Sequence, residues 1–201
     1  IVLVIKQPVE QLLASREKSE QETGGSEGEN NHFVSDKQPL MEEIAIPSVT
    51  ELYRSGIRFS PIAGNISSIY FEAKTKTLHL PIVKLDVNSE VVLRNLVAFE
   101  AASASGPLFF TRYTELMNGI IDTAEDARVL REKGIVLNHL KSDGDAAILW
   151  NGMSKSVRLS KVPLLDKVID EVNKFHDSRW KVKVMKYFKW KIFNLWKIIV
   201  L

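Results

Sequence analysis

The sequence predicts a mainly α-helical protein, with a compact helical domain, one small β-hairpin and a long C-terminal amphipathic helix. Two observations predict this class. Apolar residues recur every three or four positions through most of residues 40–178, which is typical of helices that bury one face. Short, β-branched, apolar segments flank Lys74-Thr75-Lys76, which is typical of one hairpin rather than of an alternating α/β sheet.

Composition divides the chain into segments. Its 201 residues, 45% of them hydrophobic, suffice for one domain with a real core. Residues 15–39 are polar and include GGSEGENN, so we interpret them as a flexible insertion between residues 1–14 and a helical core domain at 40–178. From residue 179 onward there are seven basic residues and no acidic one, which leaves 20 basic against 25 acidic residues before it. An acidic body therefore carries a basic tail at 179–201.

The first helix of the core domain has clear start and stop signals. Ser48 and Glu51 have the spacing of a capping box, so a helix is expected to begin at Ser48 and to end at Gly56, where a left-handed residue stops it. The hairpin follows this helix. Pro81 is expected to end the second strand of the hairpin or to place that strand at a sheet edge.

More helices are expected after the hairpin. One covers 89–102 and buries Val92, Leu96 and Phe99, and the next, at 109–121, is strongly buried. Three further helices are expected to begin at Thr123, Ser142 and Pro163. Thr123 is paired with Asp126 in a helix cap. Gly134 closes the helix that Thr123 begins. The last helix has an apolar inner stripe made of Leu165, Val168, Ile169, Val172 and Phe175.

Four motifs occur in order within residues 46–196: IPSVTEL, LHLP, NLVAFE and IDTAEDARVLREKGI. Together they resemble the pattern of the plant domain of unknown function 247 family. Asp122 stands where that family usually has Asn. The residues that carry the resemblance are Ile46, Pro47, Ser48, Val49, Glu51, Leu52, Gly56, Leu78, Leu80, Pro81, Asn95, Leu96, Ala98, Phe99, Glu100, Thr123, Ala124, Glu125 and Asp126.

The resemblance implies a plant protein of unassigned biochemical activity that is associated with a membrane through its C-terminus. It also implies that residues 1–14 are a remnant of a longer N-terminal part, and that the chain is truncated before or within a C-terminal transmembrane helix. Some members of the family are linked to pollen recognition in grass self-incompatibility. A non-catalytic recognition or signalling module is therefore the expected role.

The tail has the composition of a membrane-interface segment. Six lysines are mixed with six aromatic residues, and a helical wheel separates an apolar arc from a basic one. Lysine stems extend to anionic headgroups and indole rings lie at the water boundary, so such a helix favours an anionic membrane surface. The residues expected to contact the membrane are Lys183, Lys186, Lys189, Lys191, Trp190 and Trp196.

Two other interpretations of the tail stay open. Its apolar arc can pack on the domain, or its lysines can bind nucleic acid, although the acidic body and the one-sided aromatic arc argue against nucleic acid. If a membrane span follows the tail, the lysines place the main domain on the cytosolic side. We expect the plasma membrane as the location, and a protein partner is also compatible with the predicted role.

The sequence assigns no catalytic, cofactor-binding or metal-binding residue. The chain has no cysteine, and its four histidines are too far apart to form a metal-binding pair: His32, His79, His139 and His176. Adjacent acids such as Glu125 and Asp126 lie in a first helical turn, where the helix dipole favours them. No cofactor or metal is expected. An enzyme whose active site lies in the missing N-terminal part remains the alternative to a non-catalytic module.

Overall fold

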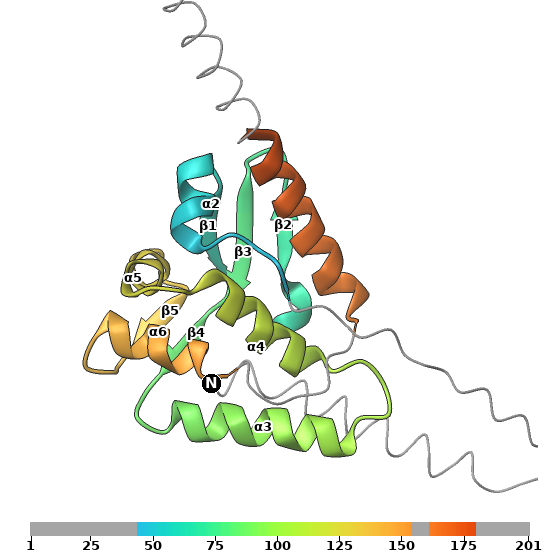
Figure 1. Cartoon of the computed structure of the whole chain (residues 1–201), viewed down its shortest axis with the longest axis vertical. Helices are drawn as coiled ribbons and strands as arrows, with labels where there is room; N and C mark the ends of the chain where they lie inside the picture. The colour runs from blue at the N-terminus through green and yellow to red at the C-terminus, as the bar shows by residue number, and fades with distance from the viewer. Residues whose placement is uncertain (1–43, 154–160, 180–201) are drawn as a thin grey trace, which may run out of the picture.

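The computed structural model of the protein describes residues 44–153 and 161–179 (Figure 1). Within these residues the helices are α2 (Val49–Ser55), the 3-10 helix η1 (Ile66–Ser68), α3 (Ser89–Ser103), α4 (Phe109–Ile120), α5 (Ala124–Glu132), α6 (Asp143–Asn151) and a last helix over 163–179. The strands are β1 (Arg58–Ile62), β2 (Tyr70–Glu72), β3 (Thr77–Pro81), β4 (Val83–Leu85) and β5 (Val136–Asn138).

The strands form two sheets, so the fold is mixed α/β, and the predicted mainly helical class with one hairpin is wrong. The first sheet has the order β1-β3-β2, in which β3 pairs antiparallel with β2 and parallel with β1. The second sheet is a parallel pair of β4 and β5. The expected hairpin is present as β2 and β3, but its second strand lies at the centre of a larger sheet.

The strands that the sequence did not indicate are short or contain proline. β4 and β5 have three residues each, too few for an alternating pattern to be recognised, and β1 contains Pro61. Pro61 is tolerated because β1 lies at the edge of its sheet, and Pro81 because it is the last residue of the central strand. Parallel pairing also joins distant residues, such as Val83 and Val136, which no local pattern reveals.

The helix starts that the sequence indicated are confirmed. The side chains of Ser48, Thr123 and Ser142 each accept a hydrogen bond from the amide three residues later. Gly56 ends α2 in the left-handed conformation at φ 98°, and Gly134 follows α5 at φ 73°. These signals are found because each one involves residues within a single helical turn.

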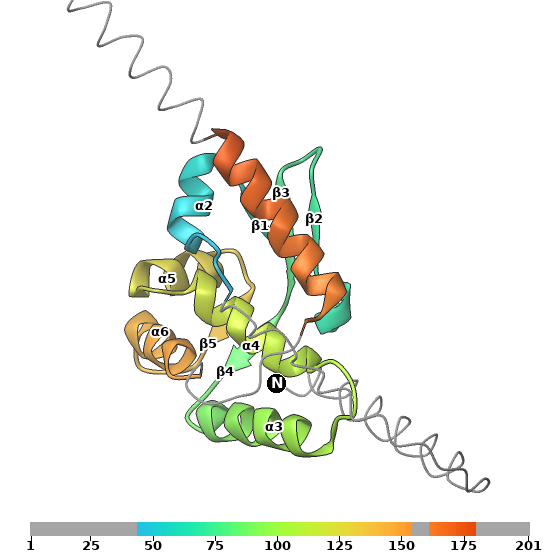
Figure 2. The same ribbon diagram turned by 45° about the vertical axis from the view of Figure 1, so that its right-hand side comes forward.

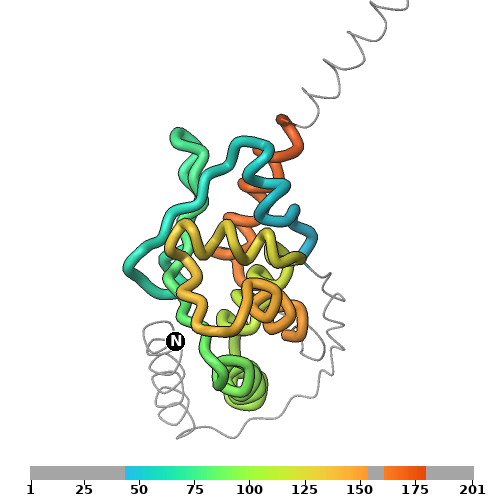
Figure 3. Tube along the Cα trace, turned by 90° about the vertical axis from the view of Figure 1, so that its left-hand side faces the viewer, coloured from blue at the N-terminus to red at the C-terminus, as the bar shows by residue number. Residues whose placement is uncertain are grey.

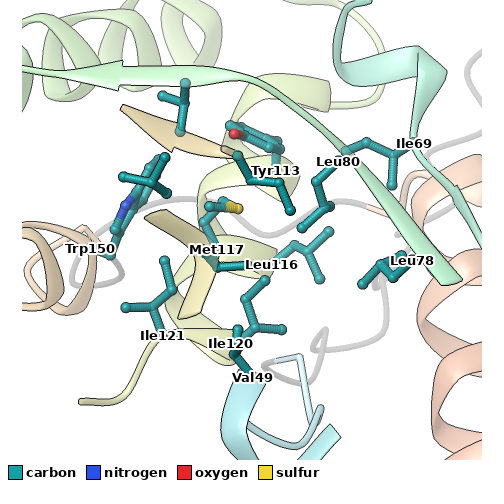
Figure 4. Packing of buried hydrophobic residues seen from close by; sticks show 14 of the residues in the cluster. Val49, Ile69, Leu78, Leu80, Tyr113, Leu116, Met117, Ile120, Ile121 and Trp150 are labelled. Atoms are coloured by element: carbon teal, nitrogen blue, oxygen red, sulfur yellow. The ribbon is translucent and has the colours of Figure 1, made fainter. Parts of the chain in front are cut away.

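The core lies between the three-stranded sheet and the helices. Helix 163–179 crosses one face of this sheet, and the ring centroids of Phe71 in β2 and Phe175 lie 5.9 Å apart (Figures 1 and 2). The helix α4 passes through the middle of the molecule and is buried on nearly all sides, as its sequence predicts. Apolar side chains from α2, β3, α4 and α6 meet there: Val49, Leu78, Leu80, Leu116, Met117, Ile120 and Trp150 (Figure 4).

A partly buried group of charges joins α4 to helix 163–179. The Arg112 guanidinium donates to Asp166 Oδ1 at 2.6 and 2.8 Å and to Glu115 Oε2 at 2.9 Å. Asp166 also accepts from the Val162 amide at 2.9 Å, before the start of its own helix. Removing one member of such a group leaves an uncompensated buried charge, so the three side chains fix how helix 163–179 sits on α4.

The helices α5 and α6 lie side by side, and β5 lies between them in the sequence (Figure 3). The Arg131 guanidinium of α5 donates to the Asp143 carboxylate in the first turn of α6 at 2.8 and 3.0 Å. Asn138 in β5 donates to the same carboxylate at 3.2 Å. This contact sets the angle at which the chain returns from α5 to α6.

The buried face of α3 differs from the predicted one. Of the predicted Val92, Leu96 and Phe99, the first two are half-buried and Leu96 packs against the core, whereas Phe99 is 47% exposed. The fully buried apolar residues are Leu93 and Val97. The buried face also contains the charged residue Glu100, which a search for apolar periodicity cannot assign to the core. As a consequence α3 presents apolar residues on more than one side.

Two aromatic polar groups are buried near the centre of the core. Tyr113 of α4 and Trp150 of α6 pack edge to face with ring centroids 6.2 Å apart. Among the described residues, neither the Tyr113 hydroxyl nor the Trp150 indole N–H has a hydrogen-bond partner. Burial raises the pKa of the Tyr113 hydroxyl, so the group stays neutral and contributes only the cost of its desolvation.

Replacing Tyr113 by Phe removes this hydroxyl and keeps the ring. Because an unpartnered buried polar group costs about 1–3 kcal/mol, we expect Tyr113→Phe to leave the free energy of unfolding unchanged or to raise it by about 1 kcal/mol. Urea denaturation followed by tryptophan fluorescence measures this. The control Tyr53→Phe alters a side chain that is 50% exposed and is expected to change stability by less than about 0.5 kcal/mol. A loss above about 1 kcal/mol in Tyr113→Phe would contradict this view of the hydroxyl.

Candidate functional site

The motif residues at the starts of α2 and α5 form two capping boxes that lie next to each other. In α2 the Ser48 amide donates to Glu51 Oε2 at 3.1 Å, and the Glu51 amide donates to Ser48 Oγ at 3.4 Å. In α5 the Thr123 amide donates to Asp126 Oδ2 at 2.9 Å, and the Asp126 amide donates to Thr123 Oγ1 at 3.4 Å. Each pair satisfies amides that a helix start leaves without partners.

Asp126 also joins the two helix starts. Its second carboxylate oxygen, Oδ1, accepts a hydrogen bond of 2.8 Å from the Thr50 amide in the first turn of α2. The side chain is fully buried, and it faces the positive ends of two helix dipoles at once. The sequence indicated the capping box of Asp126 but not this bond, because the partner lies 76 residues away.

The surroundings of Asp126 set its charge and that of a neighbour. Burial opposes ionisation of Asp126, but hydrogen bonds from Thr50 and Thr123 outweigh it and hold the pKa of the carboxyl below its usual value. The pKa of Asp122 is raised, first by burial and then by the negative charges of Asp126 and Glu51. The Asp126 shift follows from helix capping and the Asp122 shift from burial and neighbouring carboxylates, so neither by itself indicates a catalytic acid.

Glu100 caps α4 from another helix. It extends from α3 and is 4% exposed, and its carboxylate accepts from the Phe110 amide at 2.8 Å and from the amide and hydroxyl of Thr111 at 2.8 Å each. The residue at the N-cap position of α4, Leu108, makes no side-chain cap. Glu100 therefore replaces the missing local cap, a role that the sequence did not suggest because the cap comes from a separate element.

The remaining motif residues lie partly in the core and partly on the surface. Leu52, Leu78, Leu80 and Pro81 are buried. Ile46, Pro47 and Leu96 are half-buried, and Ala124 is exposed. Glu125 is exposed and pairs with Arg128 at 2.5 Å. Most of the motif thus builds the fold. Asn95 and Phe99 are exceptions, since both lie on the exposed side of α3.

The histidines of the described residues do not form a catalytic or metal-binding group. His79 in β3 stacks on Tyr70 with ring centroids 4.3 Å apart, and its Nε2 lies 3.9 Å from Glu72 Oε2. His139 is exposed, and His176 lies 3.5 Å from Asp177 on its own helix. Within residues 44–153 and 161–179 no three His, Asp or Glu side chains are close enough to hold a metal ion.

A basic surface lies where helix 163–179 ends, and we call it the basic end: Arg58, Lys74, Lys76 and Arg179. Lys76 and Arg179 both lie over the Phe175 ring, at 6.0 and 5.8 Å from its centroid. The Arg58 amide donates to the Lys76 carbonyl at 2.8 Å. The side chains of Arg58 and Lys74 are exposed, so this surface is open to an anionic partner.

The basic end is assembled from three parts of the chain. Arg58 begins β1, the two lysines occupy the turn between β2 and β3, and Arg179 comes from the C-terminal helix. A Cβ atom at Gly56 would lie 3.6 Å from the Arg179 guanidinium, which places the end of α2 there as well. Figures 1 and 2 show α2 beside the end of helix 163–179, with the β2–β3 turn at the same end of the molecule.

The predicted membrane-contact residues follow directly in the chain. Lys183, Lys186, Lys189, Lys191, Trp190 and Trp196 lie outside the described residues, and Arg179 is the member of the tail that the structure places. In the described part of the chain no helix has the length and apolar character needed to cross a bilayer.

Comparisons with known proteins give a family match. The model of the family described as plant protein of unknown function, DUF247, matches residues 8–201. A putative UPF0481 protein of Arabidopsis thaliana is 54% identical over 165 residues, which cover 82% of this chain and 31% of the relative. The chain therefore spans about a third of the length of that relative. No solved structure matches this chain.

Replacing Glu100 by Gln tests its role as the cap of α4. Glutamine has the same shape, but its amide group donates where the carboxylate accepted, so an N–H of α4 loses its partner. We expect the free energy of unfolding to fall by about 2 kcal/mol in urea denaturation. Glu90→Gln is the matched control on the same helix, since Glu90 is 53% exposed and pairs with Arg94, and it should cost less than about 0.5 kcal/mol. Equal losses in the two variants would refute the capping role.

Replacing Asp126 by Asn tests the bond between the two helix starts through its pH dependence. The folded-state pKa of Asp126 lies below its unfolded value of about 3.9, so its contribution is complete above that value and is lost as the pH falls through the folded pKa. We expect Asp126→Asn to lose about 2 kcal/mol at pH 7 and much less at pH 3. Denaturation at both pH values, with the exposed Asp170→Asn as control, measures this. A deficit that is independent of pH would contradict it.

Proposed function

The chain belongs to the DUF247 family of plant proteins of unknown function, and we propose that it acts as a membrane-associated, non-catalytic recognition or signalling module. The association of some family members with self-incompatibility agrees with a recognition role. The motif residues that sequence analysis singled out are largely occupied in helix capping and in the core. In this proposal the body supplies a recognition surface and the tail supplies the attachment.

The observation that carries the proposal is the position of the basic end. Helix 163–179 ends between Lys76 and the end of α2, and the lysine-rich sequence of residues 180–201 follows immediately. An anionic surface that attracts the tail thus also faces positive charges on the body. Two acids lie nearby and offset part of this charge: Asp177, which lies against His176, and Glu72, which accepts from the Thr75 hydroxyl in the β2–β3 turn.

The magnitudes favour a joint contact. One lysine or arginine near an anionic leaflet contributes about 1 kcal/mol, and the attraction fades within a Debye length of about 8 Å at physiological salt. The tail alone supplies six lysines. Charges on the body add to this attraction only if the body is held close to the membrane. The direct continuation of the chain from Arg179 into the lysine-rich residues favours such a position. In this orientation the domain lies on the cytosolic side, where the leaflet is anionic.

Flotation with liposomes tests attachment. We expect the 201-residue chain to float with vesicles that contain phosphatidylserine and much less with neutral phosphatidylcholine vesicles, and a chain ended at Ser178 to lose most of this binding. The fraction bound should fall steeply as salt is raised. Binding that is equal for both chains, or absent from both, would exclude the tail as the attachment.

A second pair of variants tests the basic end itself. Lys74→Gln with Lys76→Gln removes two charges beside the tail and is expected to weaken binding to anionic vesicles about thirtyfold, which corresponds to about 2 kcal/mol. Lys141→Gln with Lys161→Gln removes the same charge from exposed sites elsewhere and is the matched control. If both pairs weaken binding equally, net charge matters and the basic end has no special position.

A further inference from the structure

The cations of the basic end have no carboxylate partner, which sets them apart from other arginines of the body. Four arginines in the described part of the chain pair with an acid on their own helix or on a neighbouring one: Arg94, Arg112, Arg128 and Arg131. Within residues 44–153 and 161–179, Arg58 and Arg179 form no ion pair of 4.0 Å or less, and neither do Lys74 and Lys76. Several positive charges thus lie at one end of the molecule without being paired.

The two acids near these cations are directed to other groups. The Glu72 carboxylate accepts from the Thr75 hydroxyl and lies 3.9 Å from His79 Nε2. Asp177 Oδ1 lies 3.5 Å from His176 Nδ1. An anion that binds the basic end therefore does not have to displace an ion pair that the body already makes.

Two of the cations are held on one aromatic ring. Lys76 Nζ and the Arg179 guanidinium lie 6.0 and 5.8 Å from the centroid of the Phe175 ring. This ring packs in turn on Phe71 of β2, and the guanidinium lies 3.6 Å from a Cβ atom built at Gly56. Side chains that are placed before a ligand arrives lose less conformational entropy when they bind it.

The backbone of Lys76 is held in a strained conformation. Its φ of 58° is left-handed, and no other non-glycine residue of the described chain has a positive φ. This conformation costs free energy in a residue with a Cβ atom, so it persists only where the surrounding structure enforces it. Here the Lys76 carbonyl accepts from the Arg58 amide at 2.8 Å. Strain at a residue that presents an unpaired cation supports a role in binding.

We propose that the basic end is a binding site for a ligand that carries two or more phosphate groups close together, such as the headgroup of a phosphoinositide. A guanidinium is a planar fork that matches two oxygens of one phosphate, and an ammonium is a compact charge that serves another. Arg58 and Arg179 supply the forks, and Lys76 supplies the ammonium. A headgroup with a single phosphate uses only part of this set.

The same chemistry has two sources, a lipid headgroup and a free inositol phosphate. For the lipid, the proposal rests on the membrane attachment proposed above and names the headgroup that the body selects. For the free inositol phosphate, it concerns the body alone. The experiments therefore measure binding in solution and on vesicles separately.

Isothermal titration calorimetry of the 201-residue chain with soluble inositol trisphosphate tests the site without a membrane. We expect saturable binding of one ligand per chain, weakened at least about tenfold by Lys76→Gln with Arg179→Gln. Lys189→Gln with Lys191→Gln removes the same charge from the tail and is the matched control, with an expected change below about threefold. Equal weakening by both pairs would mean that the total charge binds the ligand, and it would refute the site.

Arg179→Lys separates a phosphate site from general attraction to negative charge. Lysine keeps the positive charge and can still lie over the Phe175 ring, but it lacks the planar fork. We expect this variant to bind inositol trisphosphate about threefold to tenfold more weakly, with an unchanged midpoint in urea denaturation. Unchanged affinity for inositol trisphosphate would contradict the proposal.

Flotation with two kinds of vesicles, matched in total negative charge, distinguishes this proposal from the attachment itself. One kind contains phosphatidylserine and the other phosphatidylinositol bisphosphate. We expect at least about tenfold tighter binding to the bisphosphate vesicles, and loss of this preference in Lys76→Gln with Arg179→Gln. Equal binding to both kinds refutes a phosphate site on the membrane and leaves the tail attachment standing. Binding of inositol trisphosphate without binding to either vesicle supports the site for the free ligand and refutes the attachment, and binding to neither refutes both.

Discussion

The buried carboxylate of Asp126 is the contact on which the arrangement of the molecule depends. One oxygen caps α5 through Thr123, and the other accepts from the Thr50 amide of α2, so two helix starts share one negative charge. The chain continues from α2 into β1 and from α5 into β5, which lie in different sheets. The hydrogen bond therefore ties α2 to α5, and the two sheets are also joined directly through Ile82, the single residue between β3 and β4. A carboxylate can be buried here because several hydrogen-bond donors converge on it and offset the free-energy cost of its desolvation.

Glu100 follows the same principle at the start of α4, and together the two acids change how the family motifs are understood. A buried acid is often a sign of an active site. Here the oxygen atoms of both carboxylates are used by backbone amides and hydroxyls at helix starts, at distances of 2.8 to 2.9 Å. Groups held in this way are not available to transfer protons to a substrate. The motifs thus describe a fold more than a reaction, which agrees with a non-catalytic role.

The sequence predicted what is decided within one helical turn and missed what is decided by distant contacts. The caps at Ser48 and Thr123 are correct because the donor and acceptor are three residues apart. The pairing of β3 with β1 and of β4 with β5 is set by packing, so short strands were missed and the fold class was wrong. On α3 the apolar period was recognised, and Val92 and Leu96 are half-buried, but periodicity does not tell where the buried face of the helix ends. Phe99 was assigned to the wrong face for this reason.

The basic end and α3 lie at opposite ends of one packed body, and this separation has a physical consequence. The basic end depends on helix 163–179, and the position of α3 depends on α4 through Glu100. Helix 163–179 and α4 are joined by the partly buried ion pair of Arg112 with Asp166, with an N to O distance of 2.6 Å. A body that is tied together in this way keeps its two ends at a fixed distance, so attachment at one end leaves the other uncovered and oriented away from the surface.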